Sequence, residues 1–130
     1  YGDWSSDVCS SDLDDFFCGL TFPYGEKCVT FVVGGWGGAV VGISTVNGES
    51  ASENETVQFK NFQKNRWYRI KVCVTKAKIE AWIDEEKMVD LETEGKTLDM
   101  RFGEIESSKP FGIATWRTTG AIKELRWRKL

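Results

Sequence analysis

Histidine is absent from this chain of 130 residues. Its absence excludes Ser-His-Asp and Cys-His catalysis and metal sites built on imidazole. Long apolar runs are also missing, and nothing comes close to the roughly 20 apolar residues of a membrane-spanning helix. Basic residues are not in excess, because 17 Lys and Arg stand against 20 Asp and Glu, for a net charge of −3. We therefore expect neither a membrane span nor a nucleic-acid partner.

Cysteine is scarce and irregularly spaced. The four cysteines form no Cys-x-x-Cys pair, so we expect no zinc site, no other metal and no cofactor. Cys18 and Cys28 fall on opposite arms of a predicted hairpin, where a disulfide in an oxidising compartment is one interpretation and two buried thiols are the other. Cys73 lies elsewhere, and Cys9 belongs to an opening segment of different character.

Alternation of apolar and polar residues dominates most of the chain. Residues 28–34, 67–75 and 79–84 each place apolar side chains at every second position. Successive side chains of a strand point to opposite faces, so this period of two predicts half-buried strands. The β-branched and aromatic residues that strands prefer are dense in these segments.

Short polar turns separate the alternating segments, and none of the segments favours a helix. Examples are residues 23–27, the dipeptide Asn47-Gly48 and residues 84–87. Eight or nine short strands with regular turns predict an all-β fold, an antiparallel β-sandwich of jelly-roll type. We expect its inner face to be led by Phe31, Val33, Tyr68, Ile70, Val72, Val74, Ile79, Ile83 and Ile113.

The first thirteen residues differ in character from the rest of the chain. Asp7–Leu13 reads DVCSSDL, which matches the translation of a sequencing adapter codon by codon. We therefore expect residues 1–13, Trp4 and Cys9 included, to be an adapter-derived artefact. Residues 14–130 are expected to form the domain, truncated at its N-terminus and part of a larger chain. A missing strand would leave an unpaired edge near residues 14–22.

Three segments together carry a family resemblance. They are residues 16–23 (FFCGLTFP), residues 33–56 with the glycine-rich VGGWGG, and residues 112–119 (GIATWRTT). Residues 14–130 resemble the concanavalin A-like, laminin-G-like jelly-roll domains of the bacterial 3-keto-disaccharide hydrolase family, which is family-16-glycosidase-like. The resemblance implies a jelly-roll fold, a carbohydrate as ligand or substrate, and a periplasmic, cell-surface or secreted location.

Tryptophans supply candidate ligand-binding residues. Four glycines flank Trp36, which is either a sugar-stacking platform beside exposed backbone or a core plug at a β-bulge. Trp82 shares a strand face with Glu80 and Asp84. This arrangement suits either binding of a sugar ring, by stacking and hydrogen bonds to its hydroxyls, or a cross-strand pair on the outer face of the sheet.

Further candidates for ligand binding are Trp116, Arg117 and Asn54. Trp116 and Arg117 follow an apolar strand, and the planar guanidinium of Arg117 either donates to vicinal hydroxyls or forms an ordinary ion pair. The amide of Asn54 suits sugar hydroxyls, and Asn54-Glu55-Thr56 also matches a glycosylation sequon.

Carboxylates offer three candidate acid or base residues, Glu53, Glu55 and Glu80. Glu80 and Asp84 on one strand would lie about 13 Å apart at ~3.3 Å per residue, whereas a retaining glycosidase needs about 5–5.5 Å. The family-16 pattern Glu-x-Asp-x-Glu is also broken, because Trp82 takes its middle position. We therefore expect a non-catalytic carbohydrate-binding module. The alternatives are a glycoside or 3-keto-glycoside hydrolase with carboxylate chemistry, and a structural domain of a larger envelope protein.

Overall fold

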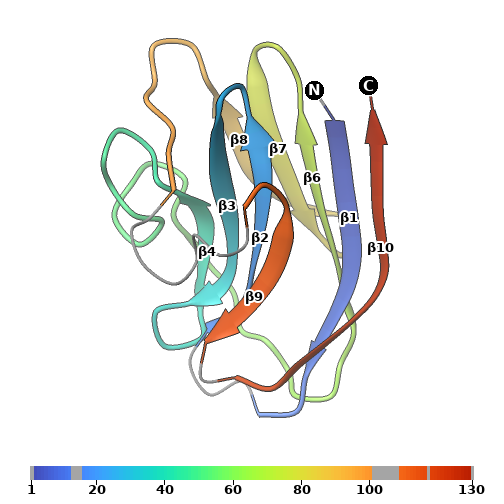
Figure 1. The fold of residues 1–130 in the computed structure, drawn as a ribbon. Helices are drawn as coiled ribbons and strands as arrows, with labels where there is room; N and C mark the ends of the chain where they lie inside the picture. The colour runs from blue at the N-terminus through green and yellow to red at the C-terminus, as the bar shows by residue number, and fades with distance from the viewer. Residues whose placement is uncertain (1, 13–15, 101–108, 117, 130) are drawn as a thin grey trace.

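The computed structural model describes residues 2–12, 16–100, 109–116 and 118–129. Two five-stranded antiparallel sheets pack face to face as a sandwich (Figure 1). The described residues form no helix, and so include none that is long and apolar enough to cross a membrane. The predicted all-β antiparallel sandwich is confirmed.

Each sheet mixes strands from distant parts of the chain. Sheet A has the order β10 (Gly120–Lys129), β1 (Gly2–Ser10), β6 (Tyr68–Val74), β7 (Lys78–Ile83) and β8 (Glu86–Glu92). Sheet B has the order β5 (Gln58–Phe59), β4 (Val40–Ser44), β3 (Lys27–Gly35), β2 (Phe16–Tyr24) and β9 (Gly112–Trp116). The strand not foreseen from the sequence is β1.

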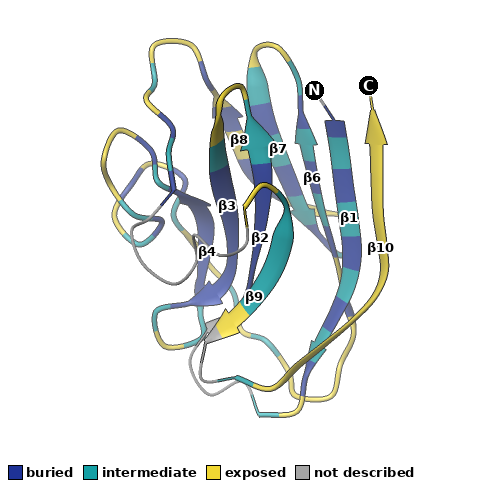
Figure 2. Cartoon of the chain, in the orientation of Figure 1, coloured by how far each residue is buried: buried dark blue, intermediate teal, exposed yellow. Residues whose placement is uncertain are grey.

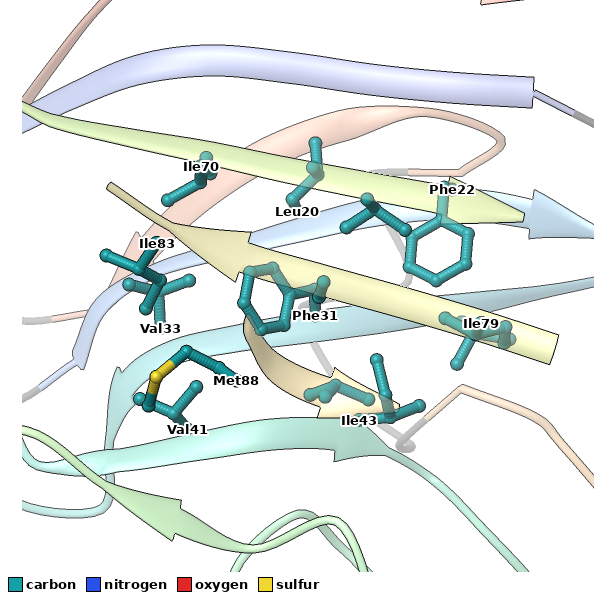
Figure 3. Packing of buried hydrophobic residues seen from close by; sticks show 14 of the residues in the cluster. Leu20, Phe22, Phe31, Val33, Val41, Ile43, Ile70, Ile79, Ile83 and Met88 are labelled. Atoms are coloured by element: carbon teal, nitrogen blue, oxygen red, sulfur yellow. The ribbon is translucent and has the colours of Figure 1, made fainter. Parts of the chain in front are cut away.

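The core lies between the two sheets, where the alternating side chains of both meet. Figure 3 shows Phe31 and Ile43 of sheet B facing Ile70, Ile79 and Ile83 of sheet A. The expected inner face is confirmed, since every residue named for it is at most 2% exposed except Ile113, which is partly buried against the same cluster. Burying a side chain of this size contributes about 1.5–3 kcal/mol to folding.

Strand β2 lies inside sheet B. Leu20 is paired with Phe31 of β3 on one side and with Ile113 of β9 on the other. The unpaired edge expected near residues 14–22 is therefore wrong for residues 16–22, the part of that range that the structure describes. The reason is that β9 returns from the far end of the chain, a pairing that the local sequence does not encode.

Residues 2–10 belong to the sandwich as β1, between β10 and β6. Trp4 and Val8 point into the core and are 4% and 1% exposed. On the other face, the Asp7 carboxylate lies 2.7 Å from Arg69, and Asp3 lies 3.0 Å from Arg128. The described sandwich thus includes residues on both sides of the division expected at residue 14. The adapter origin stays a prediction, since a fold does not record the source of its codons.

Strand β10 forms an open flank of the molecule, because β1 is its one partner among the described strands and it is exposed along its length (Figure 2). Trp127 stands opposite Trp4 in the ladder, and Ile122 stands opposite Val8. Directly opposed side chains share one face of a sheet, so both residues point to the core side. They are nevertheless 58% and 50% exposed, since sheet B ends at β9 and no described strand covers them.

Candidate functional site

An aromatic pocket lies at the end of the sandwich that carries both chain termini and the β2–β3 turn (Figure 1). Its volume is about 650 Å³, within the roughly 300–1,000 Å³ of small-molecule sites. We refer to it as the end pocket. It is lined by Trp4, Pro23, Tyr24, Gly25, Val74, Lys76, Pro110, Phe111 and Trp127.

The two tryptophans of the end pocket play different parts. The Trp4 ring is almost fully buried, with its centroid 5.7 Å from the Phe22 ring and 6.4 Å from the Phe111 ring. These contacts fix Trp4 as part of the floor. Trp127 is the cross-strand neighbour of Trp4 but is mostly exposed, because no described strand covers β10. The pocket therefore offers one rigid indole below and one accessible indole at the side.

The β2–β3 turn and the segment before β9 complete the aromatic wall. Gly25 has a φ of 60°, a left-handed conformation that suits glycine, and it lets the chain reverse directly after Tyr24. Phe111, just before β9, packs against the core from the opposite layer. Tyr24 and Phe111 are both half-buried, so part of each ring contacts the core and part faces the pocket.

Lys76 is the charged side chain of the lining, and it makes no ion pair within the described part of the chain. Its ammonium group offers three donors, the indole N–H groups are donors only, and the Tyr24 hydroxyl donates or accepts. Apolar ring faces beside a few directed donors suit a polar ligand with an apolar face. The described residues bring together no group of three or more His, Cys, Asp or Glu that could hold a metal ion.

Trp36 lies away from the end pocket, in the β3–β4 turn. A register shift between Val33 and Gly35 marks an irregularity beside it, and Trp36 itself has a φ of 45°. The half-buried indole packs against a small cluster on sheet B that includes Val32 and Val40. These contacts leave only part of its ring to a ligand.

Trp82 lies on the outer face of sheet A, between two lysines. The Nζ atoms of Lys71 and Lys87 are 5.4 Å and 5.6 Å from its ring centroid. Glu80, on the same face, forms an ion pair with Lys87. Cation–π contacts and the ion pair thus already occupy this surface.

The other carboxylates of interest are also outside the end pocket. Glu53 is exposed in the loop after β4, and Glu55 forms an ion pair with Lys96. Asp84 accepts a hydrogen bond of 2.8 Å from the backbone N–H of Arg69 at the β7–β8 turn. The structure therefore does not bring Glu53, Glu55 or Glu80 into the pocket lining.

Asn54 is buried at 4% exposure and holds its loop onto sheet B. Its Nδ2 donates to the carbonyls of Ile43 and Glu49 at 2.7 Å and 3.0 Å, and its Oδ1 accepts from the Thr56 N–H at 2.8 Å. These bonds engage both the Nδ2 and the Oδ1 atom of the amide, so Asn54 stabilises the loop. They also shield Nδ2, the atom that glycosylation of the sequon would modify.

Trp116 lies at the end of β9, with its backbone opposite Phe16 of β2. Arg117, the other candidate from this segment, lies outside the described residues.

All four cysteines are free thiols. Cys18 pairs with Val33 in the β2–β3 ladder and Cys28 with Pro23. Cys18 and Pro23 are five positions apart on β2, about 16 Å at ~3.3 Å per residue, and a disulfide needs Cα atoms within about 7 Å. Cys18 and Cys28 are therefore two free thiols and do not form a disulfide. Complete burial raises the pKa of the Cys18 thiol to about 12.

Sequence reasoning missed every residue of the end pocket. Trp4 lies in the opening segment that the sequence marks as an artefact, and Tyr24, Phe111 and Trp127 come from segments far apart in the chain. One usable signal was present: Ile122, Leu125 and Trp127 are large apolar residues in a strand that also contains five charged residues.

No protein-family model matches the chain, and no curated protein matches it. Among solved structures, the chain is similar to the carbohydrate-binding module CBM66 from Bacillus subtilis, with a TM-score of 0.56 and 14% sequence identity. The match covers 98% of this chain and 74% of that one. A likeness at this identity shows a shared β-sandwich fold.

Proposed function

We propose that this β-sandwich is a non-catalytic module that binds a carbohydrate in the end pocket. The observation that carries the proposal is that one lining contains the accessible indole of Trp127, the buried ring of Trp4 and the ammonium of Lys76, which makes no ion pair among the described residues. The apolar C–H face of a sugar ring stacks on such an indole, and the ammonium group donates to its oxygens. The fold shared with a carbohydrate-binding module supports the same conclusion.

The alternative is hydrolysis of a glycoside or 3-keto-glycoside, which the family resemblance implies. Glycosidases of the usual kind place two carboxyl groups on either side of the scissile bond. Glu53, Glu55 and Glu80 lie outside the pocket lining, and two of them are ion-paired with lysines. Assays on aryl-glycosides and 3-keto-disaccharides test this alternative: turnover that disappears in one of the Glu→Gln variants would establish it.

Substitution of Trp127 tests binding directly. We expect Trp127→Ala to weaken binding to the saccharides retained by the parent chain about tenfold, because lost stacking of about 1.4 kcal/mol is tenfold in affinity. The matched control is Trp67→Ala, which removes another indole that is 41% exposed and lies outside the end pocket. Affinity electrophoresis and titration calorimetry provide the measurement.

Trp36→Ala and Trp82→Ala distinguish the end pocket from the two sites expected from the sequence. We expect both variants to bind like the parent chain, because neither indole lines the pocket. Loss of binding in one of them, with Trp127→Ala unaffected, would move the site to that tryptophan. Absence of binding to every glycan on an array would favour the purely structural role.

A further inference from the structure

Three lysines surround the end pocket without an ion-pair partner among the described residues. Lys76 lines the cavity, Lys109 immediately precedes the lining residue Pro110, and Lys129 stands two residues after Trp127. Side chains two residues apart on a strand share a face, so Lys129 lies on the same side of β10 as Trp127. All three are exposed or at an exposed strand end.

The acidic residues at this end either pair with other cations or make no ion pair in the described part of the chain. Asp3 is held by Arg128 at 3.0 Å, and Asp99 is held by Lys27 at 3.1 Å. Glu26, in the β2–β3 turn, and Glu92 and Glu94, beside the β6–β7 turn, make no ion pair among the described residues. Within the described lining itself, Lys76 is the charged residue, on a chain whose net charge is −3.

The lining also has an excess of donors over acceptors. Among the described lining residues, the polar side-chain groups are the Lys76 ammonium, the two indole N–H groups and the Tyr24 hydroxyl, and none is a carboxylate or an amide. A neutral sugar presents hydroxyl groups that donate as well as accept, and each buried donor needs an acceptor. A carboxylate or sulfate only accepts, and so matches a lining of donors.

Resting on the carbohydrate-binding function proposed above, we propose that the end pocket selects an acidic saccharide. The sugar ring stacks on Trp127, and its carboxylate or sulfate pairs with Lys76. A cation without an ion pair in the lining of an apolar cavity raises the local concentration of an anionic ligand and speeds its association. The ligand class that we propose is a sugar with a carboxylate or sulfate group on a pyranose or furanose ring.

Matched pairs of ligands separate charge from ring shape. The probes are an oligogalacturonate with its methyl-esterified form, and a sulfated galactan oligosaccharide with its desulfated form. By calorimetry at low salt, we expect at least tenfold tighter binding of one acidic member than of its neutral partner. Which pair shows the difference identifies the carboxylate or the sulfate. The difference should shrink as salt is raised to physiological strength, because exposed charges are screened.

Two lysine variants locate the effect. We expect Lys76→Gln to weaken binding of the acidic member five- to tenfold and to leave the neutral member unchanged. The matched control is Lys64→Gln, because Lys64 is also exposed and without an ion pair in the described residues but lies outside the pocket lining. Trp127→Ala should weaken the acidic and the neutral member alike.

The outcomes separate this inference from the proposed function. Equal binding of acidic and neutral members that remains sensitive to Trp127→Ala would overturn the acidic preference and leave carbohydrate binding intact. Salt-sensitive binding of acidic members that ignores both Trp127→Ala and Lys76→Gln would show nonspecific attraction and overturn the inference. Failure to bind any saccharide would overturn both.

Discussion

The two flanks of sheet A both direct apolar side chains to the core side but differ in burial. In the covered flank, formed by β6, β7 and β8, Ile70 and Ile79 alternate with polar residues and are completely buried. In the open flank, an irregularity in the ladder brings Ile122 and Trp127 of β10 opposite Val8 and Trp4, yet Ile122 remains 50% exposed. The difference is the opposite layer, because sheet B reaches the first flank and ends at β9 before the second. Alternation fixes which way a side chain points, and the extent of the facing sheet decides whether it is buried.

The end pocket lies at the border between the covered and the open flank. Trp4 is on β1, whose core-facing side chains are buried, and Trp127 is on the neighbouring strand β10, whose side chains are exposed. A close-packed core leaves no room for a ligand, whereas an uncovered strand next to it exposes aromatic area on a rigid support. The unequal extent of the two sheets is thus what makes a binding site available at this end.

The largest expected effect comes from removing the strand that joins the flanks. A chain beginning at residue 14 loses Trp4 and Val8 from the core and leaves β10 without a sheet partner. We expect loss of cooperative thermal unfolding, because two large core side chains and two strand pairings disappear together. Circular dichroism and limited proteolysis provide the measurement.

Point variants within β1 supply the control for that deletion. Val8→Ala should destabilise the chain by roughly 1–3 kcal/mol, and Ser5→Ala on the outer face should stay within about 0.5 kcal/mol. If the chain beginning at residue 14 unfolds at the same temperature as the full chain, β1 contributes nothing to the fold. That result would agree with an adapter origin and would remove Trp4 from the pocket.

The next effect contrasts a buried aromatic residue of sheet B with the exposed tryptophan of the open flank. Phe31 is fully buried between the sheets, and Phe31→Ala should cost about 3–5 kcal/mol from lost burial and the remaining cavity. Trp127→Ala should cost less than about 1 kcal/mol, since the indole is already mostly exposed. Urea unfolding measures both. Phe59→Ala is the matched control for residue type, because Phe59 is 72% exposed; a loss equal to that of Phe31→Ala would contradict the assigned core.

An intermediate effect is expected at the loop that covers the outer face of sheet B. Asn54→Ala removes the donor to Ile43 and the acceptor for Thr56, leaving buried backbone groups without partners. We expect a loss of about 2–3 kcal/mol, since each orphaned group costs about 1–3 kcal/mol and the loop relaxes in part. Asn61→Ala, at an exposed position, is the control and should change the urea midpoint little.

The sequence predicts the covered flank well and the pocket poorly, for physical reasons. Ile70 and Ile79 alternate with polar neighbours, so their strands and inner faces follow from a local period of two. Tyr24, Phe111 and Trp127 meet only because β10 pairs with β1 and β9 pairs with β2. Such pairings join residues about a hundred positions apart in the chain, and no local pattern specifies them. Asn54 is polar and well placed for binding by sequence, but its buried bonding partners depend on the loop fold.

The smallest expected effect is a shift in acid stability from Asp99, which ties the segment after β8 to the β2–β3 turn. A backbone N–H of Met100 donates to its carboxylate at 2.8 Å, and Lys27 lies 3.1 Å away. These contacts, the Met100 hydrogen bond first, hold the pKa of Asp99 below its usual value.

A lowered pKa in the folded state means that the carboxylate stabilises the fold at pH values above its ordinary pKa of about 3.9. That contribution is lost as the pH falls through the lower folded value. Asp99→Asn should therefore lower the urea midpoint slightly at neutral pH and flatten its decline below about pH 4. Glu94→Gln, whose exposed carboxylate makes no ion pair among the described residues, is the control. Parallel acid profiles for the parent chain and Asp99→Asn would show that this contact adds nothing, in keeping with the small worth of an exposed ion pair.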